Sequence, residues 1–174
     1  MAKEQAKAAL KITRVQMIHL LNEDLAGEYQ AIIAYTVNSQ IHEGSAYTDI
    51  ARELEAHARE ELSHATKIAK EIDYLGGMPN VTPRPVKTSD DPVATLTMDL
   101  ANKRETVRRY HERILQAEAM GEFALSMTLH AIVLQEQMQE INLSLALGDN
   151  GPRTLQPADP TTHSAYNQPA GTPP

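Results

Sequence analysis

The sequence Glu60-Glu61-Leu62-Ser63-His64 lies in the middle of a long segment with helical periodicity, and the fold can be deduced outward from it. Glu61 and His64 are three residues apart, so on a helix they share one face, a turn from each other. The apolar positions that place this face in the core are Ile50, Leu54, Ile68, Ile72 and Leu75. Burying a carboxylate costs free energy unless a partner compensates it. The pair therefore indicates a buried metal site.

A second inward carboxylate is expected in the preceding helical segment. The apolar face of that segment consists of Met17, Leu21, Leu25, Ile32 and Tyr35. Glu28 lies in the middle of this face. One carboxylate from one helix and a Glu-x-x-His pair from the next are half of a carboxylate-bridged two-metal site in a four-helix bundle.

The second half of the chain repeats the first at an offset of 75 residues. Glu61 corresponds to Glu136, but the position of Glu28 is taken by Lys103 and that of the histidine by Gln139. Apolar residues again mark the inward face around these positions, namely Leu100, Val107, Tyr110 and Ile114, then Leu129, Ile132 and Leu143. The second half-site is therefore expected in place, with altered chemistry.

Composition limits the class and compartment of the protein. The chain has 174 residues, of which 41% are hydrophobic, with one Phe and no Trp, and this favours a single helical domain. The absence of cysteine excludes disulfides, thiolate ligands and a catalytic thiol. The first residues lead into no long apolar run, so we expect a cytoplasmic protein that does not span a membrane. A net charge of −7 argues against a generally nucleic-acid-binding surface.

Three regions are expected along the chain. Residues 1–12 form a charged, flexible, basic leader, and residues 13–148 form the bundle. Residues 149–174 hold six of the ten prolines and few apolar residues, and predict a disordered tail. Within the bundle, helices are expected over 13–42, 45–75, 91–120 and 122–148, with Thr13, Ser45 and Asp91 as N-caps. The segment 78–91 has three prolines and no periodicity, so it predicts an extended crossover between parallel helices.

These features resemble the ferritin-like superfamily, most closely bacterioferritin and the bacterioferritin-like Dps-like proteins. The resemblance covers residues 13–148 and rests on Glu28, Glu61-Leu62-Ser63-His64 and Glu136. The equal spacing of Glu28 to Glu61 and of Lys103 to Glu136 strengthens it. It implies an all-α, antiparallel four-helix bundle with a long crossover between the second and third helices. It also implies a hollow shell of many subunits that takes up Fe(II), oxidises it with dioxygen or peroxide, and stores the mineral.

The resemblance also implies a role for each ligand position. Glu28 and His64 would hold the first iron, and Glu61 and Glu136 would bridge to a second. Tyr35 stands where the family often keeps a tyrosine beside the metals, although an ordinary core tyrosine explains it equally well.

The altered half-site predicts one iron ion per subunit rather than two. Both terminal ligands of the second metal are replaced, so Lys103 is expected to place its ammonium among Glu61 and Glu136. Gln139 is expected to donate a hydrogen bond to a bridging glutamate, since an amide is a poor ligand beside imidazole. Oxidation by paired irons would then be lost or slowed, so the expected activity is a ferroxidase-type oxidation of Fe(II) by O2 or H2O2 with an impaired second metal site.

Four further polar residues lie close in sequence to the site positions or on the same helices. Glu105 lies two residues from Lys103, which rotates it away from the core, so it is a weak candidate ligand. His57 lies a turn before Glu61 and is, like Glu105, a weak candidate ligand that could help an ion to enter, but a histidine at the surface or just behind the ligands is the preferred interpretation. His130 and Glu140 fall off the inward face and are expected to be solvated.

The same ligand set allows two other functions, and further residues bear on haem, shell size and DNA binding. A catalytically silent structural or DNA-protecting cage and a mononuclear Mn or Zn protein both fit the ligand set. No haem is expected, because Leu62 occupies the position at which bacterioferritin has its haem methionine. The missing fifth helix favours a shell of twelve subunits over twenty-four. Residues 1–12 predict a weak, salt-sensitive association with DNA.

Overall fold

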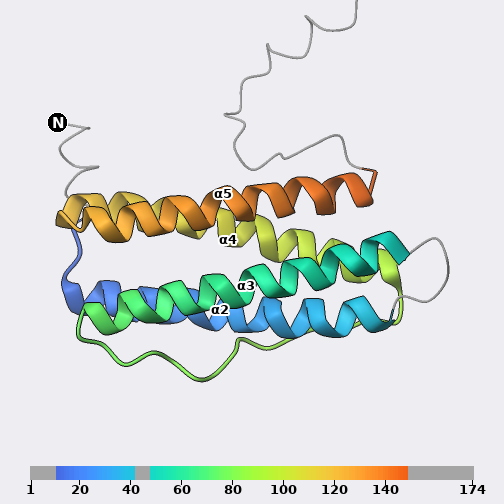
Figure 1. Ribbon diagram of the computed structural model, residues 1–174, viewed down its shortest axis with the longest axis horizontal. Coiled ribbons are helices and arrows are strands. Elements are labelled where there is room, and N and C mark those ends of the chain that lie inside the picture. Colours follow the sequence, from blue (N-terminus) through green and yellow to red (C-terminus); the bar gives the residue numbers. More distant parts are fainter. Residues whose placement is uncertain (1–10, 42–47, 149–174) are drawn as a thin grey trace, which may run out of the picture.

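Four long helices form the protein. The computed structural model describes residues 11–41 and 48–148. The helices are α2 (Arg14–Ile41), α3 (Thr48–Tyr74), α4 (Pro92–Met120) and α5 (Phe123–Ala146). They lie side by side, with α2 packed mainly on α3 and α4 mainly on α5 (Figure 1). The all-α four-helix bundle is therefore confirmed. The predicted tail, the first ten residues of the leader and the cap at Ser45 lie outside the described residues.

The helix ends follow the predicted capping chemistry. Thr13 and Gln16 form a reciprocal capping box, since each side chain accepts a hydrogen bond from the other residue's backbone N–H, at 2.8 and 3.2 Å. Asp91 accepts a hydrogen bond from the backbone N–H of Val93, with proline at the first helical position of α4. Gly121 ends that helix in the left-handed conformation, with φ of 80°, which glycine adopts without steric cost.

The predicted crossover between α3 and α4 is confirmed. It runs the length of the bundle beside α2, so α3 and α4 point in the same direction (Figure 1). Several hydrogen bonds fasten it to α2: the backbone N–H of Arg84 donates to the carbonyl oxygen of Ala26 at 2.9 Å, and the Gln30 amide donates to that of Pro85 at 2.6 Å.

The core consists of two apolar clusters with a polar layer between them. One cluster contains Leu25, Ala65, Val107 and Val133 among its members, and the other is built from Tyr35, Leu54, Leu96, Leu100 and Leu143. On each helix, the inward polar residue lies in sequence between residues of one cluster and residues of the other. All four helices therefore bring a polar side chain to the same level of the bundle.

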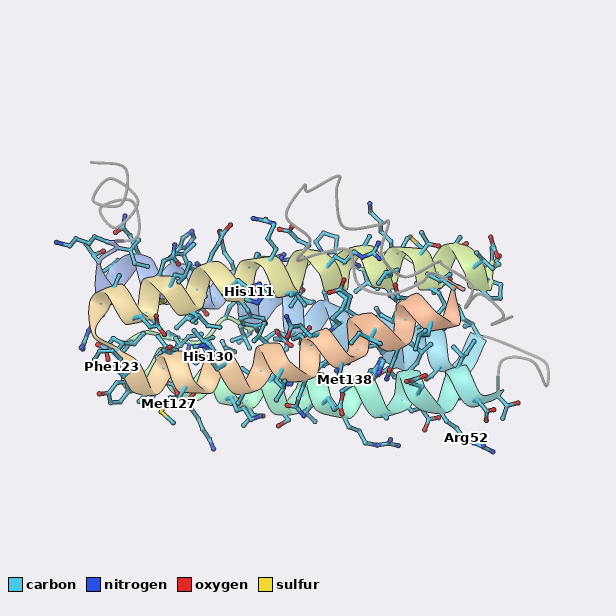
Figure 2. The ribbon with its side chains drawn as sticks, turned by 90° about the horizontal axis from the view of Figure 1, so that it is seen from above. Arg52, His111, Phe123, Met127, His130 and Met138 are labelled. Atoms are coloured by element: carbon cyan, nitrogen blue, oxygen red, sulfur yellow. The ribbon has the colours of Figure 1, made fainter. Side chains whose placement is uncertain are left out.

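Apolar side chains also lie on the outside of the subunit. Phe123, Met127 and Met138 project from α5 and are 58–74% exposed (Figure 2). Exposed apolar surface of this kind is typical of proteins that associate. None of the described helices is long and apolar enough to cross a membrane.

Candidate metal centre

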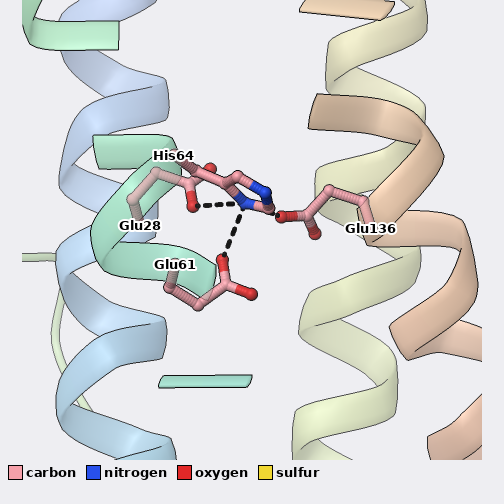
Figure 3. Close-up of side chains that lie close together, drawn as sticks. All are labelled: Glu28, Glu61, His64 and Glu136. Atoms are coloured by element: carbon pink, nitrogen blue, oxygen red, sulfur yellow. Dashed lines mark hydrogen bonds and ion pairs between the residues drawn. The ribbon is translucent and has the colours of Figure 1, made fainter. Parts of the chain in front are cut away.

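Four buried side chains from three helices converge at the polar layer. Glu28 comes from α2, Glu61 and His64 from α3, and Glu136 from α5 (Figure 3). Each offers a ligand atom, these atoms all lie within 4.8 Å of one another, and no side chain of the four is more than 2% exposed. The four residues that the sequence singled out as metal ligands are thus brought together.

The ligand atoms are arranged around Nδ1 of His64. This nitrogen lies 2.9 Å from Oε1 of Glu136 and 3.6 Å from Oε2 of both Glu28 and Glu61. The two Oε2 atoms are buried without a hydrogen-bond partner. Unsatisfied buried carboxylate oxygens are costly. Three carboxylates with one imidazole suit a divalent first-row ion. The residues present therefore fit a metal ion.

The second ring nitrogen of His64, Nε2, also has a hydrogen-bond partner. Nε2 of His64 lies 3.0 Å from the amide oxygen of Gln135, which fixes the ring orientation and leaves Nδ1 facing the carboxylates. Burial alone would lower the pKa of His64, but hydrogen bonds to Glu136, Glu28 and Glu61 outweigh it and raise the pKa to about 12. Without a metal the ring is therefore an imidazolium.

Lys103 contacts the carboxylates of Glu61 and Glu136 on the side away from His64. Its Nζ lies 2.9 Å from Oε1 of Glu61 and 2.5 Å from Oε2 of Glu136. Each of these carboxylates thus directs one oxygen towards His64 and the other towards the ammonium. Burial would lower the pKa of Lys103, but the charges of Glu136 and Glu61 raise it well above its usual value. The ammonium has the position expected for it.

Protonation of Glu28 reduces the negative charge of the metal-free site. Burial, followed by the charges of Glu61 and Glu136, raises the pKa of Glu28 well above its usual value and favours its neutral form. Burial would also raise the pKa of Glu61, but Lys103 and His64 hold it well below its usual value. The ammonium of Lys103 and the imidazolium of His64 then face the carboxyl groups of Glu61 and Glu136. A divalent ion can exchange for the protons of Glu28 and His64 without changing the net charge.

Gln139 differs from its prediction. Its Nε2 donates a hydrogen bond to Oε2 of Glu60 at 2.7 Å, not to a bridging glutamate. Its Oε1 is buried without a partner. Because Lys103 already takes the oxygens of Glu61 and Glu136 that face this side, the amide turns to the rim of the bundle.

Tyr110 is a site residue that the prediction missed. Its hydroxyl donates a hydrogen bond to Oε1 of Glu28, and the ring is 1% exposed. The 75-residue offset relates Tyr110 to Tyr35, which was already a candidate, so the repeat could have identified Tyr110 as a site residue. The same offset relates Glu28, the partner of Tyr110, to Lys103, so Tyr35 has a lysine nearby where Tyr110 has a glutamate. The hydroxyl of Tyr35 forms no hydrogen bond with any described residue.

Tyr110→Phe should destabilise the metal-free protein by about 1–3 kcal/mol, because it leaves Oε1 of Glu28 buried without a donor. Tyr35→Phe is the matched control at a second buried tyrosine and should cost clearly less, because no carboxylate loses a donor. Urea unfolding of both variants at equal subunit concentration measures the difference. Equal losses in the two variants would show that the hydrogen bond to Glu28 is energetically unimportant.

Of the two positions expected for His57, at the surface or just behind the ligands, the structure excludes the surface. It is 3% exposed and lies edge-on to Tyr35, with ring centroids 5.5 Å apart and an interplanar angle of 64°. Burial, together with the charge of Lys103, lowers its pKa to about 4, so the ring is neutral near pH 7. Its place a full turn before Glu61 puts it on the same inward face.

The remaining candidates behave differently from one another. Glu105 points away from the metal centre and pairs with Arg108 at 2.7 Å, as its rotation on the helix predicted. His130 is exposed, in agreement with its prediction. Glu140 was expected to be solvated but is 1% exposed. It lies a turn after Glu136, and the side chain of Arg104 covers it, with Nε 3.4 Å from Oε1.

A second polar pair repeats at the 75-residue offset. Asp24 accepts a hydrogen bond from Nε of Arg113 at 2.7 Å, and the related pair is Asp99 and Asn38 at 2.9 Å. Asp99 faces a neutral amide where Asp24 faces a guanidinium. Burial therefore raises the pKa of Asp99 to about 6, although Asn38 and Lys103 both act to lower it.

Asp99→Asn should stabilise the metal-free protein at pH 7 by up to about 3 kcal/mol. The folded-state pKa lies above the unfolded value of 3.8, so the contribution of Asp99 to stability is complete below pH 3.8 and is lost as pH rises through about 6. The variant and the native protein should therefore converge near pH 4. Unfolding measured at pH 4, 5, 6 and 7 tests this. A stability difference that does not depend on pH would contradict it.

Residues 18–150 match the ferritin-like domain family, so the chain belongs to that family. Bacterioferritin from Rhodobacter capsulatus is 27% identical over 123 residues, which span 70% of this chain and 76% of that protein. The resemblance expected from the sequence is confirmed.

Solved structures show the same relationship. A ferritin-like, diiron-carboxylate protein from Bacillus anthracis strain Ames has a TM-score of 0.75 and 31% identity, covering 78% of this chain and 99% of its own. A dodecameric thioferritin, the bacterioferritin-related protein of Bacteroides fragilis, has a TM-score of 0.73 and 25% identity over 83% and 93% of the two chains.

Proposed function

We propose that this protein binds one Fe(II) ion per subunit and takes part in oxidising and storing iron inside a shell of identical subunits. The ligands would be Glu28, Glu61, His64 and Glu136. One observation supports a single ion above all: the two bridging carboxylates share their oxygens between His64 and the ammonium of Lys103. The position of a second ion is thus filled by a protein charge.

The number of iron ions at the site determines how many electrons can be transferred at once. Two adjacent Fe(II) ions can deliver two electrons to one oxidant molecule, whereas a single ion delivers one. We therefore expect slower oxidation than at a paired site. Glu28, Glu61 and Glu136 would hold the ion, His64 would complete its ligands once deprotonated, and Tyr110 would hold Glu28 in place.

Metal analysis of protein purified without added metal, followed by anaerobic Fe(II) titration and oxidation kinetics, tests the proposal. We expect about one ion per subunit at the site. His64→Ala should abolish this binding, while His130→Ala, at an exposed histidine on α5, should leave it unchanged. Two tightly bound ions would refute the ligand assignment. Firm retention of Mn or Zn without Fe(II) oxidation would favour the mononuclear alternative, and no bound metal would favour a silent cage.

The shell is proposed as a dodecamer. The exposed apolar surface on α5 supports association, and the dodecameric Bacteroides fragilis protein is a structural neighbour. Light scattering of the purified protein measures its mass, and a monomer at micromolar concentration would exclude a shell. We expect no haem at Leu62, which is 58% exposed on α3 and has no lone pair to offer iron.

A further inference from the structure

A small pocket opens between α2, α4 and the crossover, on the side of the bundle where Lys103 lies. It has a volume of about 50 Å³. Lys103 and Tyr35 form part of its lining, and two guanidinium groups, those of Arg84 and Arg109, line it as well. The space suits one small ion or a few water molecules.

Gly27 makes room for these guanidinium groups. It lies in the interior of α2, where glycine is disfavoured relative to alanine. A Cβ atom here would lie 3.0 Å from Nη2 of Arg109 and 3.8 Å from Cζ of Arg84. The missing side chain therefore allows two like charges to approach the same short stretch of helix.

The acidic groups near this pocket have other cationic partners. Asp24 lies 3.3 Å from Nε of Arg109 but is held more closely by Arg113, at 2.7 Å. Glu105 lies 3.9 Å from Nη1 of Arg109 but pairs with Arg108 at 2.7 Å. The Nε atom of Arg109 is buried and makes no hydrogen bond.

Asp99 is the other carboxylate in the lining, and its hydrogen bond comes from Asn38. Burial and the charge of Arg109 lower the pKa of Arg84 from its usual value, which reflects the crowding of the two guanidinium groups. The lining holds three cationic residues, Arg84, Arg109 and Lys103, against the two carboxylates Asp99 and Glu105, within a protein whose net charge is −7.

We propose that this pocket binds a small oxyanion of the size of phosphate, held by Arg84 and Arg109. Guanidinium groups bind oxyanions through charge-assisted hydrogen bonds. Amide and hydroxyl groups of Gln30, Asn102 and Thr106 also line the space and can donate to further oxygens. The same charges repel Fe(II), so the pocket is a site for an anion rather than a path for iron.

Isothermal titration calorimetry of phosphate into the metal-free, full-length protein at low salt tests the proposal. We expect saturable binding, weakened roughly tenfold or more by Arg84→Gln because a charge-assisted contact is lost. Gly27→Ala should weaken binding similarly, because its methyl group enters the pocket beside the flexible end of Arg109. Alanine favours the helix, so this variant should fold. Arg59→Gln removes the same charge from an exposed position on α3 and should have little effect.

Three outcomes would overturn the proposal. They are no phosphate binding by the native protein at millimolar concentration, an equal loss in Arg59→Gln and Arg84→Gln, or full affinity in Gly27→Ala. The last would show that the glycine serves only the packing of the crossover on α2. The measurement uses no metal, so its failure is independent of whether iron binds at His64.

Discussion

Replacing Lys103 by glutamate and Gln139 by histidine together should raise the Fe(II) bound per subunit from about one to about two, and should speed its oxidation. The first change removes the ammonium that contacts Glu61 and Glu136, at 2.9 and 2.5 Å, and frees one oxygen of each for a second ion. It also supplies a third carboxylate on that side. The second change offers an imidazole one turn after Glu136, related by the repeat to His64.

Anaerobic Fe(II) titration and stopped-flow oxidation of the double variant measure both effects. Glu105→Gln is the control, because this exposed carboxylate pairs with Arg108 and should not alter the iron count. The prediction fails if the double variant folds and still binds only one ion. If the native protein already binds two ions, Lys103 must leave the site on loading, and Glu105 becomes the first residue to reconsider.

The second large effect concerns the charge balance of the site. Lys103→Met should lower the free energy of unfolding of the metal-free protein by about 3–5 kcal/mol, because it leaves two buried carboxylates without their cation. The side chain is 2% exposed, so water cannot replace the ammonium. A divalent ion can replace the missing charge, so the variant should regain about 3 kcal/mol of stability when the metal is present at one hundred times its Kd.

Urea unfolding in EDTA, and again with added Zn(II), separates these two states. Lys70→Met, at an exposed position on α3, should change stability by less than about 0.5 kcal/mol. A variant as stable as the native protein in EDTA would mean that Glu61 or Glu136 is protonated there. In that case the ammonium would not be needed to balance the carboxylates.

The sequence alone determined the fold and the place of the metal site. Helical periodicity located four helices, and capping residues such as Thr13 and Asp91 located two helix starts. The prolines between α3 and α4 predicted the crossover. Inward Glu28 and Glu61 were recognisable because a carboxylate at a core position contradicts the apolar pattern around it. The 75-residue repeat then identified Glu136 and the substituted Lys103.

Only the tertiary structure decided how the polar side chains share their partners. Gln139 bonds to Glu60, while Lys103 takes one oxygen each of Glu61 and Glu136, and no spacing in the sequence reveals this division of partners. Tyr110 reaches Glu28 across the bundle, a contact that depends on the packing of α2 against α4. Burial of His57 and Glu140 likewise depends on neighbouring helices. Periodicity assigns a residue to a helix face, whereas the exposed fraction and the hydrogen-bond partner depend on what other elements place there.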